Sequence, residues 1–333
     1  MRETLIVRLP NWLGDTVMAV PVLRALRAGF ADARVVLAGP WVSLLAGHGL
    51  GDILMTYPRS WTGRLRAADA ARETRADIAL LLPNSFEAAL AARYWGARRR
   101  IGFAGGGRDW LLTDPQPLPT PRMHQVDEYL RLLEPLGVPV VETEPRLAPP
   151  ARDSEERRAV RALLAESGAA PGRGRVIGIH LGAAFGPSKL WPPERVAELC
   201  ARLREDGDVP LLLGTRDDQW LADAVTCHIA VASLVGRDRP ALLPALLAEL
   251  DALVCGDTGL GHLAAALGTP VVALFGPTDP RLTAPRGRAA ALTHPTPCAP
   301  CFYRACPIDH PCMRGITAAV VRDQASTLLA CAR

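Results

Sequence analysis

The sequence contains very little lysine and asparagine. Lys189 is the single lysine among 38 basic residues, and asparagine occurs only as Asn11 and Asn84. Such depletion suggests a genome that disfavours the codons for both residues. Each remaining residue is then a candidate for a position at which the usual substitute fails. Chance survival is the alternative, and only the positions of the three residues can decide between the two interpretations.

Long apolar stretches and an export signal are also missing. The longest apolar runs, such as 78–82 and 271–275, are far shorter than the roughly 20 residues that span a bilayer as a helix. The N-terminus enters a strand-like stretch at 5–9 with no leader-like region before it. We therefore expect a cytoplasmic protein. Its net charge of +4 is too small to indicate nucleic acid, but it suits contact with an anionic membrane surface.

The length and the pattern of apolar residues predict two α/β domains. At 333 residues, the chain exceeds the size that one core usually serves. Strand-like runs alternate with helix-like segments in both halves, which is typical of parallel sheets covered by helices. A proline-containing linker separates the halves. We predict two Rossmann-like, doubly wound domains, 1–153 and 154–333, facing each other across a cleft that holds the ligand.

The first candidate site is NWLGD, residues 11–15, between the first strand and its helix. Gly14 would let backbone N–H groups approach an anion closely, and the helix start adds partial positive charge. Asp15 is placed where a carboxylate can act as a base. Alternatively, Asp15 only caps a helix that begins near Thr16.

The second candidate is the loop HLGAAFGPSKLWP, residues 180–192, which follows the first strand of the second domain. Lys189 lies just ahead of a helix, where an ammonium group can hold a diphosphate, and Ser188 can add a hydroxyl. The alternative is a solvated surface lysine.

The third candidate is CGDTGLGHLAAALG, residues 255–268. Asp257, Thr258 and Gly259 follow a strand, and His262 lies at the start of a helix of small residues. His262 is alternatively a partner of Asp257. A further strand ends near Asp217, whose carboxylate can accept hydrogen bonds from ribose hydroxyls, although turn and cap roles for Asp217 and Asp218 fit equally well. The spacing of a Walker loop or a dinucleotide fingerprint is missing, which disfavours an ATPase or a dehydrogenase.

Four cysteines, Cys298, Cys301, Cys306 and Cys312, form the pattern C-x2-C-x4-C-x5-C. The first pair has zinc-like spacing, and His294 and His310 are possible additional ligands. The other spacings are irregular, so free thiols are the favoured interpretation and we predict no required metal.

Several segments together resemble the lipopolysaccharide heptosyltransferases of glycosyltransferase family 9, and within it the heptosyltransferase II branch. They are RLPNWLGDTVMAVPVLRAL, LLPNSFEAALAARYWGARRRIGF, GAAFGPSKLWPPERVAEL, GDTGLGHLAAALGTPVVALFGPTDP and the closing PCAPCFYRACPIDHPCMRGI. They occur in this order over nearly the whole chain.

The resemblance implies a GT-B fold, ADP-L-glycero-D-manno-heptose as donor and the lipid A-linked inner core of lipopolysaccharide as acceptor, at the inner face of the cytoplasmic membrane. It implies that Asp15 is the general base, that Lys189 binds donor phosphate and that residues 257–262 line the donor site. Glu87 departs from the basic residue expected in many relatives. The candidate residues for the acceptor side are Asn11, Asn84, Ser85 and His124.

A single displacement with one carboxylate implies inversion at the anomeric carbon, and no cofactor is expected if Lys189 and helix N-termini neutralise the leaving group. Two alternatives stay open: a sugar-nucleotide epimerase of the same fold, and a non-catalytic protein that senses a nucleotide or lipid A.

Overall fold

The computed structural model describes residues 2–58, 60–170, 172, 174–237 and 239–330. The chain forms two compact units, Met1–Pro145 and Arg146–Arg333. The division falls a few residues before the predicted boundary at 153/154. Leu147 already belongs to the second unit, because its backbone N–H donates to the carbonyl oxygen of Ala266 at 2.8 Å.

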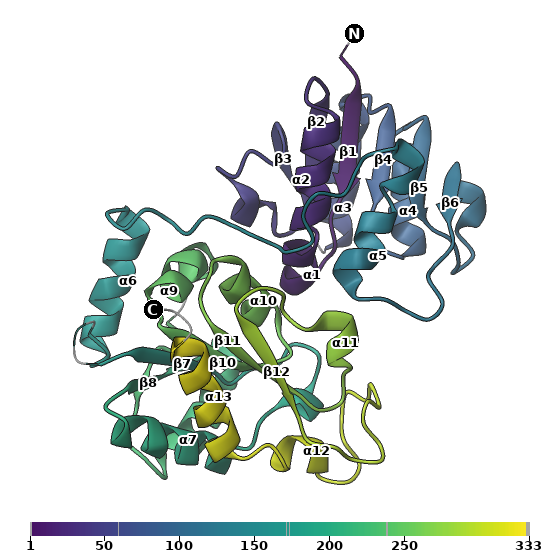
Figure 1. Cartoon of the computed structure of the whole chain (residues 1–333). Coiled ribbons are helices and arrows are strands. Elements are labelled where there is room, and N and C mark those ends of the chain that lie inside the picture. The colour runs from purple at the N-terminus through teal and green to yellow at the C-terminus, as the bar shows by residue number, and fades with distance from the viewer. Residues whose placement is uncertain (1, 59, 171, 173, 238, 331–333) are drawn as a thin grey trace. The chain divides into compact units, whose positions relative to one another are not determined.

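The first unit is a six-stranded parallel sheet in the order β3-β2-β1-β4-β5-β6, and its helices lie on both faces (Figure 1). The strands are β1 Thr4–Arg8, β2 Arg34–Gly39, β3 Ile53–Thr56, β4 Ile78–Leu81, β5 Arg99–Phe103 and β6 Asp114–Gln116. The helices are α1 Leu13–Met18, α2 Val20–Gly29, η1 Val42–Leu45, α3 Trp61–Glu73, α4 Phe86–Tyr94, η2 Asp109–Leu111, α5 Gln125–Arg131 and η3 Glu134–Leu136.

The second unit repeats this architecture, with a parallel sheet in the order β12-β11-β10-β7-β8-β9. The strands are β7 Val176–His180, β8 Val209–Leu213, β9 Ala232–Ser233, β10 Ala252–Gly256, β11 Val271–Phe275 and β12 Ala289–Thr293. The helices are α6 Glu155–Glu166, η4 Pro187–Lys189, α7 Pro193–Glu205, η5 Arg216–Asp218, α8 Gln219–Thr226, η6 Pro240–Leu242, α9 Leu243–Glu249, α10 Gly259–Ala266, α11 Pro280–Thr283, α12 Pro311–Arg314 and α13 Ala318–Ala330.

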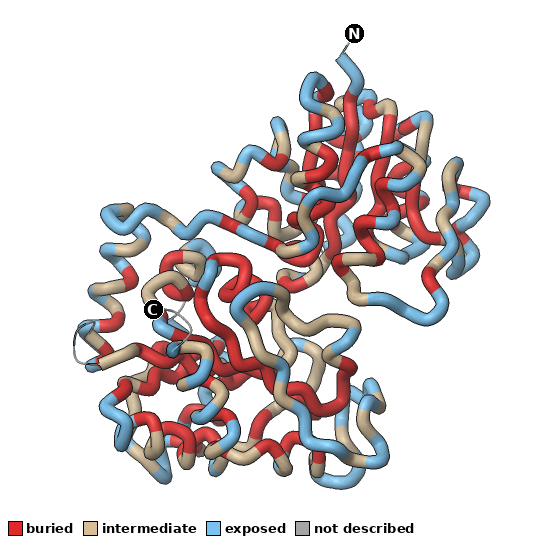
Figure 2. Tube along the Cα trace, in the orientation of Figure 1, coloured by how far each residue is buried: buried red, intermediate tan, exposed pale blue. Residues whose placement is uncertain are grey.

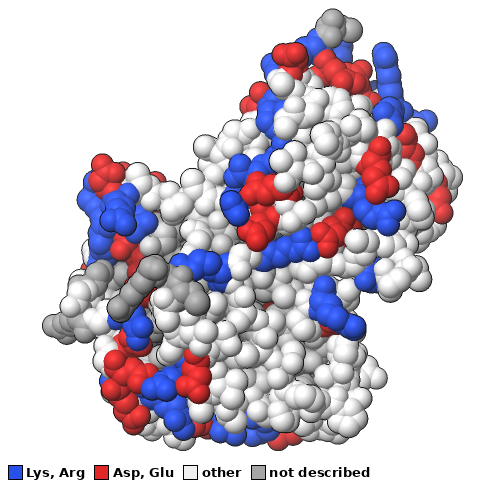
Figure 3. All heavy atoms as spheres, viewed as in Figure 1, with Lys and Arg blue, Asp and Glu red and all other residues white. Residues whose placement is uncertain are grey.

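The central strands are buried along their whole length and consist mainly of apolar residues, because helices cover both faces of each sheet. All residues of β1, β4, β10 and β11 are buried, and the strands form the buried interior of each unit in Figure 2. On the outside, basic and acidic side chains are interspersed on the face shown in Figure 3. Among the helices that the structure describes, none is long and apolar enough to cross a membrane.

The candidate segments follow the carboxyl ends of the strands, where open α/β sheets bind ligands. In the first unit, 11–15 follows β1 and 84–85 follows β4. In the second unit, the segment that ends at Lys189 follows β7, and 257–262 follows β10. The predicted doubly wound α/β architecture is therefore confirmed for each unit.

Candidate active site

Asp15 lies within the first turn of α1. The helix begins at Leu13, and its N-cap residue, Trp12, makes no side-chain capping bond. Asp15 is thus the third residue of the helix, and the prediction that it might be the cap of a helix starting near Thr16 is wrong. A carboxylate in this turn is stabilised by the helix dipole. Asp15 also lies near Tyr129 of α5, where burial first, and then the charge of Asp15, hold the pKa of the phenol well above its usual range.

The turn before Asp15 is held by a buried arginine. Arg8, fully buried at the end of β1, donates from Nη2 to Oδ1 of Asn11 at 2.8 Å and from Nη1 to the carbonyl of Leu9. The ring N–H of Trp41 donates to the Asn11 carbonyl at 3.2 Å. The Arg8 guanidinium stacks on Tyr57 at 4.3 Å, and desolvation lowers the pKa of Arg8. Asn11 therefore has a structural task in shaping this turn.

Asn84 has the same kind of partner. Arg108 is fully buried and donates from Nη2 to Asn84 Oδ1 at 3.1 Å. Its other N–H groups reach the carbonyl oxygens of Phe103, Pro83 and Ser85, with distances of 3.0, 2.7 and 3.2 Å. Both asparagines of the chain thus accept a hydrogen bond from a buried arginine. The sequence could not single out Arg8 and Arg108 because arginine is so abundant.

The other two acceptor-side candidates cap helices. Ser85 Oγ accepts from the Ala88 N–H at 3.2 Å at the start of α4. His124 Nδ1 accepts from the Val126 N–H at 3.2 Å at the start of α5. These bonds fix where each helix begins.

Glu87 at the start of α4 contacts Tyr57 and Arg64. Its Oε1 accepts from the Tyr57 hydroxyl at 3.2 Å, and its Oε2 lies 3.4 Å from Nη1 of Arg64. Burial, followed by the charge of Glu87, raises the pKa of Tyr57 to about 12. Because Glu87 is paired with Arg64, it adds little uncompensated negative charge here.

Lys189 is a buried member of an ion pair. Its Nζ lies 2.5 Å from Oδ2 of Asp257 and 3.2 Å from the Asp257 carbonyl oxygen, and the side chain is 9% exposed. The ring of Phe185 lies 4.7 Å from the ammonium group. The alternative of a solvated surface lysine is wrong. Neighbouring Ser188 is buried as well, and its hydroxyl donates to the carbonyl of Tyr303 at 2.6 Å.

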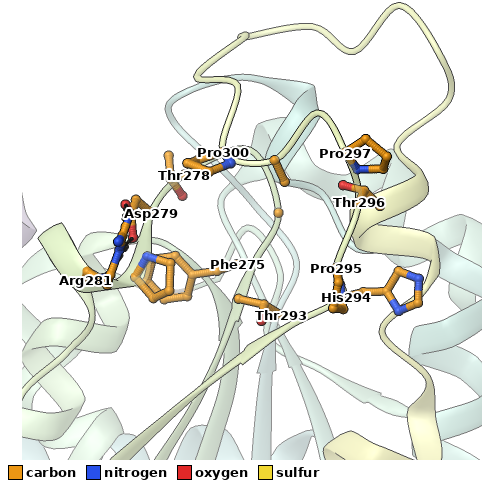
Figure 4. A pocket seen from close by; sticks show the side chains of 13 residues that line it. Phe275, Thr278, Asp279, Arg281, Thr293, His294, Pro295, Thr296, Pro297 and Pro300 are labelled. Atoms are coloured by element: carbon orange, nitrogen blue, oxygen red, sulfur yellow. Dashed lines mark hydrogen bonds and ion pairs between the residues drawn. The ribbon is translucent and has the colours of Figure 1, made fainter.

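Asp257 has a second partner that the sequence did not indicate. The Thr278 hydroxyl donates to Asp257 Oδ2 at 2.8 Å. Thr278 follows β11 and lines a pocket of about 600 Å³ together with Asp279, which caps α11 and is paired with Arg281 (Figure 4). Thus the carboxylate that holds Lys189 is itself oriented from the neighbouring strand end.

The segment after Asp257 opens helix α10. Thr258 is its N-cap and makes no side-chain capping bond, and its buried hydroxyl lies beside the Cys255 thiol. Gly259 is the first residue of the helix, and His262 is buried in its first half. The N-terminus of α10 therefore lies next to the ion pair of Asp257 and Lys189.

Asp217 and Asp218 differ in their surroundings. Asp217 is exposed, whereas Asp218 accepts from the Thr215 N–H at 2.7 Å and from its hydroxyl at 2.8 Å as part of a capping box. A Cβ on Gly182 would come within 2.4 Å of the Asp218 carboxylate, so Gly182 leaves space for it. The cap role that the sequence left open is therefore confirmed for Asp218, which is also the carboxylate that lies against the loop leading to Lys189.

The cysteines among the described residues carry free thiols. Cys298 is exposed and Cys312 is buried, and burial is the main cause that raises the pKa of Cys312. Cys306 Sγ accepts from the His310 N–H at 3.2 Å. Within the described ranges, no group of three or more His, Cys, Asp or Glu side chains is arranged to hold a metal ion.

The chain is similar in sequence to known glycosyltransferases. Residues 64–311 match the model of glycosyltransferase family 9 (heptosyltransferase). The chain is 30% identical to lipopolysaccharide heptosyltransferase 2 of Escherichia coli K12 over 311 residues, 85% of each chain, and 30% identical to that of Salmonella typhimurium over 310 residues, again 85% of each.

Solved structures agree as well. The structure of E. coli ADP-heptose LPS heptosyltransferase II matches with a TM-score of 0.79 and 27% identity over 99% of both chains. A family 9 glycosyltransferase from Veillonella parvula matches with a TM-score of 0.81 over 98% of this chain and 97% of that one, and its 21% identity supports the fold alone. The chain therefore belongs to glycosyltransferase family 9, the heptosyltransferase family, and has the GT-B fold of two Rossmann-like units.

Proposed function

We propose that this glycosyltransferase moves a heptose from ADP-L-glycero-D-manno-heptose to the inner core of lipopolysaccharide, with inversion at the anomeric carbon. The similarity to the heptosyltransferase 2 proteins supports the choice of substrates. The observation that carries the proposal is the buried pair of Lys189 and Asp257 at the carboxyl end of the second sheet.

The second unit is proposed to bind the donor. The Lys189 ammonium group faces a carboxylate that can give way to the diphosphate, or share the cation with it, without moving the lysine. The N-terminal N–H groups of α10 follow directly and favour negative charge. We assign Gly259 and His262 to this site too, and Ser188 and Asp217 to its periphery.

The first unit is proposed to supply the base. The acceptor hydroxyl attacks the anomeric carbon and gives its proton to Asp15, while the bond between that carbon and the diphosphate oxygen breaks and ADP leaves with the electron pair. Gly14 allows the backbone to approach the substrates closely. Asn11, Asn84, Ser85 and His124 are assigned to the acceptor side, in addition to the structural bonds that they make.

No metal is required in this proposal. The charge that grows on the leaving diphosphate is neutralised by Lys189 and by backbone N–H groups. We predict that a strong chelator leaves both the transfer rate and the melting temperature unchanged, because Lys189 and the backbone N–H groups take the place of a metal at the diphosphate. Loss of one equivalent of zinc together with folded structure would contradict this prediction.

The acceptor determines where the enzyme works. Because lipid A anchors the core oligosaccharide in a bilayer, we propose a cytoplasmic enzyme with peripheral contact to the inner face of the cytoplasmic membrane. No observation on this chain favours an epimerase or a non-catalytic sensor over a transferase.

The direct test is product analysis. The full chain is incubated with ADP-heptose and a panel of defined, truncated core acceptors, and products are identified by mass. We expect one core to gain the mass of one heptosyl residue, with release of ADP. Conversion of the donor without any acceptor would indicate an epimerase, and donor binding without turnover on every core would indicate a sensor.

A further inference from the structure

One face of the first unit exposes large apolar side chains. They are Trp61 and Leu65 on α3, Phe86, Leu90 and Tyr94 on α4, and Trp110 in η2, and we call them the α3–α4 face. Trp61 and Trp110 are 71% and 72% exposed. A groove of about 680 Å³ runs between the two helices, lined by all of these side chains except Trp110.

These side chains are not needed for the core of the unit. The inner sides of the helices are built from alanine, with Ala67, Ala71, Ala89 and Ala92 packed in the core cluster of the sheet. The outer positions recur four residues apart, so the apolar side chains form continuous rows on the solvent side. A helix that faced only water would carry polar residues there, and a contiguous exposed apolar patch marks a binding surface.

The two helices carry charges of both signs, with a small excess of arginine: Arg64, Arg66, Arg72 and Arg93 against Asp69, Glu73 and Glu87. Arg64 lies 6.0 Å from the Trp61 ring, and Arg72 lies 5.3 Å from the Tyr94 ring. Two carboxylates of the face are occupied: Asp69 accepts from the Tyr94 hydroxyl at 2.6 Å, and Glu87 is paired with Arg64.

Three further arginines are available to an anionic partner. Arg66, Arg72 and Arg93 are exposed, and none has a carboxylate partner in the part of the chain that the structure describes. The face thus combines aromatic and aliphatic groups with a small excess of positive charge.

We propose that the α3–α4 face docks the protein onto an anionic lipid bilayer. Tryptophan and tyrosine favour the boundary between water and hydrocarbon, and arginine binds the phosphates of anionic headgroups. A second copy of the chain fits less well, because its arginines would be brought against these arginines. The inference deepens the proposed function, since a membrane-anchored acceptor has to be reached from the bilayer surface.

The position of the face suits that task. Trp61 begins α3, the next helix after β3, and Phe86 begins α4, the next helix after β4. Both residues therefore lie toward the carboxyl edge of the first sheet, the edge that also carries Asp15.

The test is co-sedimentation of the full chain with vesicles of phosphatidylcholine alone or with added phosphatidylglycerol. We expect binding to the anionic vesicles that weakens with salt. The double variant Trp61→Ser/Leu65→Ser should bind at least tenfold more weakly, and Arg72→Gln/Arg93→Gln should lose most of the preference for anionic vesicles. The matched control is Trp220→Ser, which removes a tryptophan that is 59% exposed on α8 of the second unit and should bind normally. Circular dichroism checks that every variant is folded.

Three outcomes would overturn the proposal: no vesicle binding by the unaltered chain, equal losses in the control, or a dimer in solution that Trp61→Ser dissolves. Transfer to a water-soluble truncated core separates this inference from the proposed function. Intact transfer without vesicle binding overturns the docking surface alone, whereas vesicle binding without transfer to any core overturns the transferase assignment alone.

Discussion

The two units bury their cations in different ways. In the first unit, the guanidinium groups of Arg8 and Arg108 bind carbonyl oxygens and the amide oxygens of the two asparagines. In the second unit, Lys189 binds the side chain of Asp257, which Thr278 also contacts.

The kind of partner indicates which buried cations only stabilise the fold and which can bind a ligand. Backbone carbonyl groups cannot move away from Arg8 and Arg108 unless the loops that carry them unfold. These two arginines therefore hold the loops in place. A carboxylate side chain can exchange its partner for a phosphate, so Lys189 stays available to a ligand. Two sheets of similar topology thus hold their buried cations with different partners, and in the first unit the charge that we propose to be functional is that of Asp15.

The largest expected effect comes from Asp15→Asn. Removal of the base should lower turnover by roughly 10² to 10⁴, the usual range for general-base catalysis. The helix should persist because asparagine is tolerated in its first turn. Steady-state kinetics with saturating donor, and thermal melting for folding, decide the matter; turnover near that of the unaltered enzyme would leave Asp15 without a catalytic role.

Substitution of Lys189 is expected to have the second-largest effect. Negative charge grows on the diphosphate as the sugar leaves, so the ammonium group stabilises the transition state more than the bound donor. We predict that Lys189→Ala lowers both donor affinity and turnover. Lys189→Arg should keep the fold but recover only a small part of the activity, because its planar fork fits the buried space beside Phe185 and Asp257 poorly. Full activity in either variant would refute the assignment.

Arg108→Leu tests the other kind of buried cation. The substitution leaves several buried carbonyl oxygens without donors, which should cost about 3 kcal/mol of unfolding free energy. Donor affinity should be unchanged. Urea denaturation measures the loss, with Arg98→Leu, at an exposed arginine, as the matched control. Equal stability of the two variants would show that the hydrogen bonds of Arg108 do not stabilise the fold.

Thr278→Val should have the smallest effect. Loss of one hydrogen bond to Asp257, worth about 1 kcal/mol, should weaken donor binding roughly fivefold through a less fixed Asp257 and Lys189. Thr293→Val, which alters another threonine of the same pocket, is the control. If the two variants bind donor equally well, Thr278 has no positioning role.

Much of the fold could be predicted from the sequence, because strands buried on both faces appear as short apolar runs such as 78–81 and 271–275. Lys189 could be identified by its rarity. The start of α1 could not be predicted from the sequence, because Trp12 at its N-cap makes no side-chain capping bond.

Long-range partners were the other part that the sequence could not provide. Asp257 lies 68 residues from Lys189, and Thr278 lies a further 21 residues along. Nor did the sequence indicate that Ser188 would bond to Tyr303, or which arginines would be buried. Such pairs depend on which strand ends become neighbours in the sheet.

Calorimetric titration of ADP-heptose into the unaltered enzyme, Asp15→Asn and Lys189→Ala tests the central claim most directly, namely that the second unit holds the donor while the first unit supplies the base. The account predicts that Asp15→Asn binds donor with the affinity of the unaltered enzyme, whereas Lys189→Ala binds at least tenfold more weakly. Normal donor binding by Lys189→Ala, or its loss in a folded Asp15→Asn, would contradict this division of roles.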